Sequence, residues 1–234
     1  MTSGIGFAER DGVLEITLDR PPDNLWDTAM LEAAMGQIQA ASTSALIAIR
    51  LRATGEAFCL GRERQAHNAS ELRAEGQRLA DMLRAWTSTP LLTLAEVHGD
   101  AAGFGANLVG LADVAIASRT AQLSFPEIRG RLAPTLVLSW LPAHVGYQRA
   151  MELVTTGQAI DAATACSYGL VNRVVAPEEL AEAVDGVLAT WREVDPIALR
   201  DIKRFAVNTR YWPPDRAAAY AVEALALSAL GLQR

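Results

Sequence analysis

The sequence has few of the features on which disulfide-rich, metal-binding or membrane-spanning proteins depend. Only two of its 234 residues are cysteines, Cys59 and Cys166, and they lie far apart without the spacing of metal ligands. No apolar run reaches the roughly 18 residues that a membrane-spanning helix needs. Residues 1–10 lack a basic start followed by an apolar stretch. We therefore expect a cytoplasmic protein with no membrane partner, no metal site, and two buried, reduced cysteines.

Concentrated charge of one sign is also missing. The formal net charge is -6 and no basic run stands out, so we expect no nucleic-acid partner. None of the three histidines, His67, His98 and His144, lies beside a serine or cysteine in a nucleophile-elbow motif. The sequence therefore offers no recognisable nucleophile–histidine pair.

What the sequence does contain is the patterning of an α/β protein. Half of the residues are hydrophobic and 21% are charged, which is typical of a globular chain. Strand patterns alternate with helix patterns through short turns, which predicts an α/β fold with a ligand site at the strand ends. The expected strands cover residues 13–18, 45–51, 91–97 and 113–118, and the expected helices follow Asp27 and cover 71–86.

Beyond Pro134 the pattern becomes mainly helical, with amphipathic stretches at 177–191 and 214–230. We therefore expect an α/β core over residues 1–190 and a helical C-terminal extension over residues 191–234.

Two glycine-containing turns follow expected strands. One ends at Gly61, and the other contains Gly103 and Gly105. A glycine-rich turn lets backbone N–H groups approach a ligand, and the start of the following helix favours negative charge. If the two turns converge, their amides would stabilise a developing oxyanion, with one donor contributing roughly 3 to 4 kcal/mol.

In their order and spacing these segments resemble the crotonase, or enoyl-CoA hydratase/isomerase, superfamily. The resemblance is carried by Leu18-Asp19-Arg20-Pro21 with Asn24, residues 55–61, residues 97–113, Phe125-Pro126-Glu127-Ile128 with Pro134, Gly157, and residues 169–175. It implies a crotonase-like fold of repeated ββα units and an acyl-CoA substrate, with no cofactor besides the coenzyme A of that substrate. It also implies a homotrimer or homohexamer assembled through the C-terminal extension. Residues 20–27 and 141–146 are similar to the branch that hydrates cyclic dienoyl-CoA thioesters.

The resemblance places the family's oxyanion amides on Arg62 and Phe104, where Phe104 stands in place of the middle glycine of a Gly-Gly-Gly turn. Of the two glutamates that hold water in family hydratases, one is present as Glu127 and the other is replaced by Asn107. Because an amide cannot act as a general base, Glu127 would work alone. That favours isomerisation, and it leaves hydration open if Asn107 positions the water.

Further residues have open assignments. Asp100 would either supply a second carboxylate or cap its turn. Trp140 would pack in the core or line the acyl pocket, and the candidate partners for the phosphates of coenzyme A are Arg62, Arg64, Lys203 and Arg204. Decarboxylation or thioester hydrolysis in the same oxyanion pocket is an alternative activity, and a non-catalytic CoA-binding homologue is another alternative.

Overall fold

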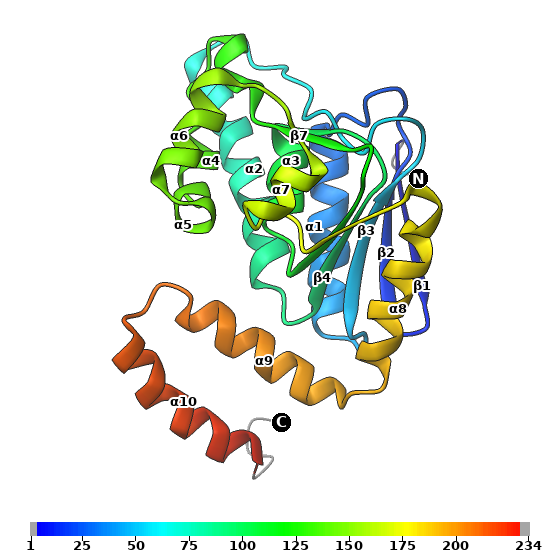
Figure 1. Ribbon diagram of the computed structural model, residues 1–234, viewed down its shortest axis with the longest axis vertical. Helices are drawn as coiled ribbons and strands as arrows, with labels where there is room; N and C mark the ends of the chain where they lie inside the picture. The colour runs from blue at the N-terminus through cyan, green and yellow to red at the C-terminus, as the bar shows by residue number, and fades with distance from the viewer. Residues whose placement is uncertain (1–3, 230–234) are drawn as a thin grey trace.

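The computed structural model describes residues 4–229 and shows a mixed sheet with helices on both faces (Figure 1). The strands of the main sheet are β1 (Ile5–Arg10), β2 (Val13–Leu18), β3 (Ala48–Ala53), β4 (Leu92–Val97), β6 (Val114–Ser118) and β9 (Arg173–Val175). They lie in the order β1-β2-β3-β4-β6-β9, in which β1 is antiparallel to β2 and every other pair is parallel. A smaller sheet has the order β5-β7-β8 and consists of β5 (Ala101–Ala102), β7 (Gln122–Ser124) and β8 (Ile160–Asp161).

Helices connect and cover these strands. The first half of the chain contains α1 (Thr28–Ser42), α2 (Ala69–Ser88), α3 (Phe104–Gly110) and the 3-10 helix η1 (Pro126–Gly130). The second half contains α4 (Thr135–Leu138), α5 (Leu141–Val145), α6 (Tyr147–Thr156), α7 (Ala162–Ser167), the 3-10 helix η2 (Pro177–Glu179), α8 (Leu180–Arg192), α9 (Pro196–Thr209) and α10 (Pro214–Ala229). Within residues 4–229, no helix combines the length and apolar character that crossing a bilayer requires.

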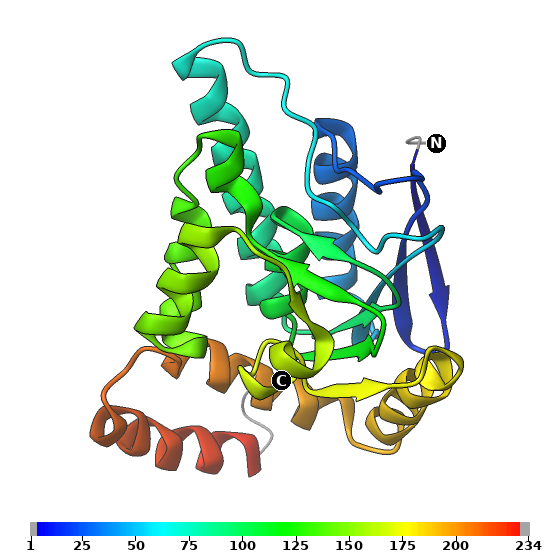
Figure 2. The same ribbon diagram turned by 45° about the horizontal axis from the view of Figure 1, so that its top comes forward.

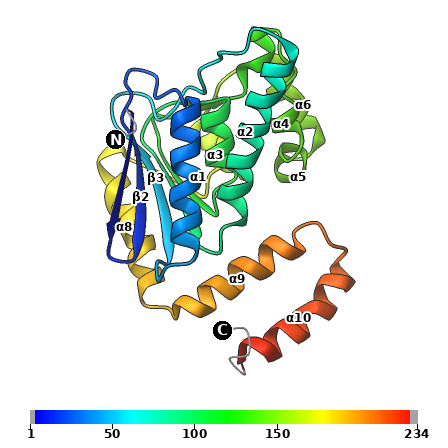
Figure 3. The same cartoon turned by 180° about the vertical axis from the view of Figure 1, so that it is seen from behind.

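Successive side chains of the parallel strands enter two separate cores. Leu94 and Ile116 pack in one core with Leu188 of α8, whereas their neighbours Ala95 and Ala117 belong to the larger core on the side of α1 and α2. Figures 1 and 3 show α8 and α1 on opposite faces of the sheet. Because both faces are buried, most residues of β4 and β6 are apolar, which is why the sequence pattern located them. The buried polar side chains of β4 have partners, since Thr93 bonds to Asp113 and Glu96 accepts from Arg50.

The predicted α/β class with a helical C-terminal region is confirmed, and several elements lie where the sequence placed them. Asp27 caps α1, because its carboxylate accepts a hydrogen bond from the amide of Met30 at 2.8 Å. The second strand begins three residues later than expected, at Ala48, and the buried residues Leu46 and Ile47 lie in the loop before it, where burial gives them the apolar character of a strand. The predicted helix at 214–230 corresponds to α10, and residue 230 lies outside the described residues.

The elements that the sequence pattern did not locate include β1, the three short strands of the small sheet, and β9. Strands of two or three residues are too short to show a periodic pattern. At the other end of the chain, α9 and α10 form an arm beside the body of the molecule (Figure 2), joined by stacking of Phe205 on Tyr220 with ring centroids 5.7 Å apart.

Candidate active site

The first glycine turn is held in place by the segment that follows β2. The buried side chain of Asn24 donates hydrogen bonds from Nδ2 to the carbonyl oxygens of Thr54 and Ala57, both at 2.8 Å. Further along, the amide of Trp26 donates to the carbonyl of Gly61 at 3.1 Å. The loop that leads to Gly61 is thus held at its start by the Asn24 side chain and at its end by the backbone amide of Trp26.

The second turn lies directly against the first. Cys59 forms a parallel bridge with Ala101, and the amide of Ala102 donates to the carbonyl of Cys59 at 2.8 Å. A Cβ atom at Gly105 would lie 2.2 Å from that same carbonyl oxygen, so the approach of the two backbones requires glycine there. The two glycine turns therefore lie side by side.

The amides of Arg62 and Phe104 are available as donors. Within residues 4–229 neither N–H donates to another group of the protein, and Phe104 opens α3, where the first N–H groups have no partner inside the helix. Both residues line the same cavity. The Phe104 ring packs edge-on against buried Trp26, with ring centroids 5.8 Å apart, so the side chain in place of the family's middle glycine is accommodated in the core.

That cavity has a volume of about 650 Å³ and is mostly apolar. Its walls come from α2, the two glycine turns, η1 and the segment before and within α4. The residues that carry polar or charged side chains are few: Arg62, Arg64, Gln77, Asn107, Glu127 and Thr135. Glu127 is the only acidic residue among the described residues that line it.

Glu127 is placed over the second turn by η1. A Cβ atom built on Gly103 would lie 3.5 Å from Oε1 of Glu127, and Oε2 is buried with no hydrogen-bond partner within residues 4–229. Burial raises the pKa of this carboxyl above its usual range, and the opposing hydrogen bond from its own backbone is the smaller effect. A carboxyl with a raised pKa on the wall of a cavity is suited to accept and return a proton.

Asn107 also lines the cavity, but its side-chain amide has protein partners on both sides. Nδ2 donates to the carbonyl of Gly103 at 2.8 Å, and Oδ1 accepts from the indole Nε1 of Trp140 at 2.7 Å. Trp140 is buried behind Asn107 and is not among the residues lining the main cavity; it lines a second cavity of about 270 Å³. The assignment of Trp140 to the acyl pocket remains a prediction.

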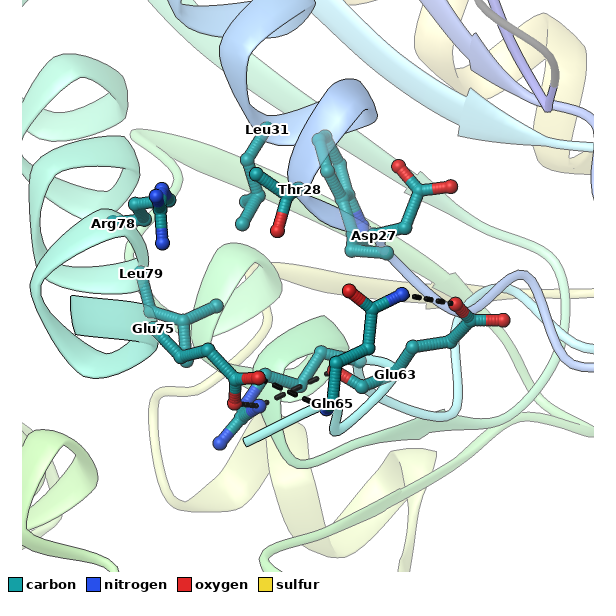
Figure 4. Close-up of a pocket in the computed structure, with 10 residues that line it drawn as sticks. Asp27, Thr28, Leu31, Glu63, Gln65, Glu75, Arg78 and Leu79 are labelled. Carbon is teal, nitrogen blue, oxygen red and sulfur yellow. Dashed lines mark hydrogen bonds and ion pairs between the residues drawn. The ribbon is translucent and has the colours of Figure 1, made fainter. Parts of the chain in front are cut away.

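The Arg62 side chain forms an ion pair with Glu75 of α2, beside a cavity of about 10 Å³ that is no larger than one water molecule. Figure 4 shows Glu75 linked to Gln65. The backbone N–H of Gln65 donates to the carboxylate of Glu75 at 2.9 Å. Burial alone would raise the pKa of Glu75, but the hydrogen bonds from Gln65 and Arg62 outweigh it and lower that pKa. The guanidinium of Arg62 thus has a partner, whereas exposed Arg64 lines the main cavity and has no ion pair among the described residues.

Lys203 lies elsewhere, contrary to the expectation that it meets a phosphate. It is buried and forms an ion pair with Asp113 at 2.6 Å, and burial lowers the pKa of its ammonium despite that partner. Arg204 pairs with Asp201 on the same helix at 2.6 Å. Neither residue lines the cavity.

Asp100 and the two cysteines are also placed by the structure. Asp100 is exposed, does not line the cavity, and accepts a hydrogen bond from the amide of Gln122 at 2.9 Å, as a turn-capping residue does. Burial raises the pKa of the Cys59 thiol to about 12, so it stays protonated. Cys166 is only half-buried, so the expectation that both cysteines are buried is wrong for this one.

One wall of the cavity was missed by the sequence reasoning. Leu72, Gly76 and Ala80 recur every fourth residue along α2 and all line the cavity. Residues at this spacing share one helix face, and the small side chains at two of the three positions leave room for a ligand. The spacing of Gly76 and Ala80 is the feature of the sequence that could have indicated a ligand-facing side of this helix.

The sequence matches the family described as enoyl-CoA hydratase/isomerase over residues 8–229. It is 37% identical over 176 residues to a probable enoyl-CoA hydratase of Rhodobacter capsulatus, an alignment that covers 73% of this chain and 68% of that protein. It is 29% identical over 211 residues to the enoyl-CoA isomerase/hydratase fer4 of Mycosarcoma maydis, covering 84% of this chain and 77% of that one. The crystal structure of an enoyl-CoA hydratase of Mycobacterium smegmatis matches with a TM-score of 0.92 at 28% identity, covering 96% of this chain and 90% of that chain.

Proposed function

This chain belongs to the enoyl-CoA hydratase/isomerase family and is an enzyme of that type, and from this premise we propose that it isomerises enoyl-CoA thioesters with Glu127 as its only proton-transferring group. The observation that carries the proposal is the single carboxylate of the cavity, which lies over the second glycine turn with one oxygen unpartnered among the described residues.

The proposed reaction moves one proton and leaves the molecular formula unchanged. The carboxylate of Glu127 takes a proton from the carbon between the thioester carbonyl and the double bond. The released electron pair forms an enolate, whose oxygen accepts hydrogen bonds from the amides of Arg62 and Phe104. Glu127 then returns the proton to the far carbon of the former double bond, which leaves the double bond conjugated with the carbonyl.

Arg64 is our candidate for binding the phosphates of coenzyme A. It is the exposed cation on the cavity wall that has no ion pair within residues 4–229, whereas the side chain of Arg62 is paired with Glu75. Arg64→Ala should raise KM with little change in kcat, because a phosphate contact far from the reacting carbons contributes equally to substrate and transition state.

Hydration is the second candidate, favoured by the names of the relatives described above. It would require Glu127 to deprotonate the water and to protonate the neighbouring carbon. Incubation with 3-enoyl-CoA and 2-enoyl-CoA thioesters separates the two activities, since isomerisation yields the conjugated 2-enoyl thioester and hydration adds one water to it. Release of carbon dioxide or free coenzyme A would instead indicate decarboxylation or thioester hydrolysis.

Glu127→Gln is the decisive variant. We expect kcat to fall by about 10²–10⁴-fold, the usual contribution of a general acid–base group, with acyl-CoA affinity retained. Glu178→Gln, at an exposed glutamate of η2, is the matched control and should leave both quantities unchanged. Full turnover in Glu127→Gln would refute the proposal, and tight binding of acyl-CoA without turnover of any thioester by the unmodified protein would indicate a non-catalytic homologue.

We also propose assembly as a homotrimer or a dimer of trimers through residues 191–234. Supporting this, α10 exposes Val222 and Leu225, whose relative exposures of 68% and 72% are high for large apolar side chains. Residues 230–234 of the extension lie outside the described part of the chain.

A further inference from the structure

We propose that Trp140 is a positioning residue, which orients the Phe104 N–H toward the enolate oxygen by way of the Asn107 side chain. The inference rests on the proposed function, because it concerns the amide that would bind the enolate. Its starting point is the chain of hydrogen bonds from Trp140 through Asn107 to Gly103.

The indole of Trp140 decides which way the Asn107 amide faces. An indole N–H can only donate, so the atom 2.7 Å from it must be the oxygen of Asn107. The amide nitrogen consequently faces the carbonyl of Gly103, to which it donates at 2.8 Å. The reversed amide would place its NH₂ against the indole N–H and its oxygen against the Gly103 carbonyl, which would lose both hydrogen bonds.

The Gly103 carbonyl and the Phe104 N–H are the two ends of one planar peptide unit and point in opposite directions. The carbonyl accepts from the Asn107 side chain and also from the Asn107 backbone amide at 3.0 Å. Both bonds draw the oxygen toward α3, so the Phe104 N–H is directed to the other side. Gly103, with φ at +52° and ψ at −116°, has no Cβ to limit rotation of this unit, so its direction depends on such contacts.

This arrangement gives Asn107 a task that an ionised glutamate or aspartate could not perform. A carboxylate only accepts hydrogen bonds and would repel the Gly103 carbonyl. Trp140 itself is held firmly, because its ring packs edge-on against buried Phe125 with centroids 6.1 Å apart. Phe125 immediately precedes η1, so the same indole contacts the segment that leads to Glu127.

The test compares Trp140→Phe with Trp86→Phe. Trp86 is a matched control, because it is also buried and its indole donates to a carbonyl of α3, that of Leu108, at 3.0 Å. The probe is butyryl-CoA carrying ¹³C at the thioester carbonyl, which binds without a double bond to move. Its ¹³C shift on binding reports how strongly the carbonyl oxygen is polarised.

In the unmodified protein we expect a downfield shift of the bound carbonyl. Trp140→Phe should reduce that shift and lower kcat by about tenfold, less than the 10²–10³-fold that removing a whole oxyanion donor costs, with KM little changed. Trp86→Phe should keep the shift and kcat, even if its thermal midpoint falls as far. Asn107→Asp, of almost the same shape, should also lose the shift because its carboxylate cannot donate to Gly103.

A Trp140→Phe protein that keeps the full shift, or a Trp86→Phe protein that loses as much of it, would overturn the positioning role. A gain of hydration in Asn107→Glu or Asn107→Asp would also overturn it, since Asn107 would then be a substituted base and not a required donor. If butyryl-CoA does not bind the unmodified protein, or binds without polarisation of its carbonyl, the proposed function fails first and this inference fails with it.

Discussion

At the scale of single residues, the proposed chemistry depends on a glutamate whose surroundings disfavour its charge. Oε2 of Glu127 is buried without a protein partner in the described structure, and burial raises the pKa of the carboxyl. The charged form thus has a cost in the folded protein that it does not have in the unfolded chain. The pH dependence of catalysis and the pH dependence of folding stability should both reveal this cost of ionising Glu127.

For catalysis, the acidic limb of the pH profile should follow Glu127. As a base it must be ionised, so kcat/KM for isomerisation should fall with decreasing pH through a pKa higher than the roughly 4.3 of an exposed glutamate. The profile of initial rates against pH measures this value. An acidic limb at or below the ordinary glutamate pKa would contradict the raised value.

For stability, a folded-state pKa above the unfolded one means that the contribution of Glu127 is fully present below the unfolded pKa and is lost as pH rises through the folded pKa. Glu127→Gln lacks this titration. Urea unfolding across a pH series should therefore show the variant gaining stability relative to the unmodified protein as pH rises, with the difference flat at acid pH. If the free energy of unfolding of Glu127→Gln fell relative to that of the unmodified protein as pH rises, folding would lower the pKa of Glu127 and not raise it.

At the scale of elements, the site depends on two turns that meet through their backbones. The contact between Gly105 and the Cys59 carbonyl leaves no space for a side chain. Neither partner can relieve the contact by a rotamer change, since the obstructing atom is a backbone oxygen. The geometry of the donor pair is thus tied to the stability of the fold.

Gly105→Ala should accordingly destabilise the protein by about 1–3 kcal/mol, the usual cost of overpacking, or more, and should lower turnover. Gly36→Ala is the control, because Gly36 lies on the exposed side of α1 with open space around its Cα. There alanine should be neutral or stabilise by up to about 1 kcal/mol, as expected within a helix. Equal midpoints of denaturant unfolding for the two variants would contradict the backbone contact.

The sequence predicted those features that have a local signal. β4 and β6 are mostly apolar because both sheet faces are buried, and Asp27 lies directly before its helix. Partners distant in the chain have no such signal. In the sequence Lys203 is indistinguishable from a surface cation, because its partner Asp113 lies 90 positions earlier. Likewise, nothing in the sequence links Trp140 to Asn107, which lies 33 positions away.

At the scale of the whole molecule, the arm of α9 and α10 is anchored to the body along α9, where Arg200 also donates hydrogen bonds to carbonyls of residues 42–46, and is exposed along much of α10. Lys203 joins α9 to Asp113 at the start of β6, whereas α10 exposes apolar side chains. An arm of this kind is suited to pack against a second copy of the chain.

Leu225→Glu should therefore shift the protein from the proposed trimer to monomer. A buried, unpaired carboxylate at a subunit contact is costly, whereas the same residue on an exposed face is not. Light scattering coupled to size-exclusion chromatography measures the mass. Tyr147→Glu, on the exposed side of α6, is the control and should leave the mass unchanged. A trimer that persists in Leu225→Glu would exclude this face from the contact.

The single carboxylate of the cavity also has a stereochemical consequence. In the proposed reaction Glu127 lies on one side of a flat enolate whose oxygen is held by the two turns, so the hydrogen it removes and the hydrogen it adds should occupy the same face of the acyl chain. A proton held on Oε2, which is buried, would be shielded from exchange with solvent between the two steps. A substrate deuterated at the carbon that loses its proton should then deliver part of that deuterium to the far carbon of the same molecule.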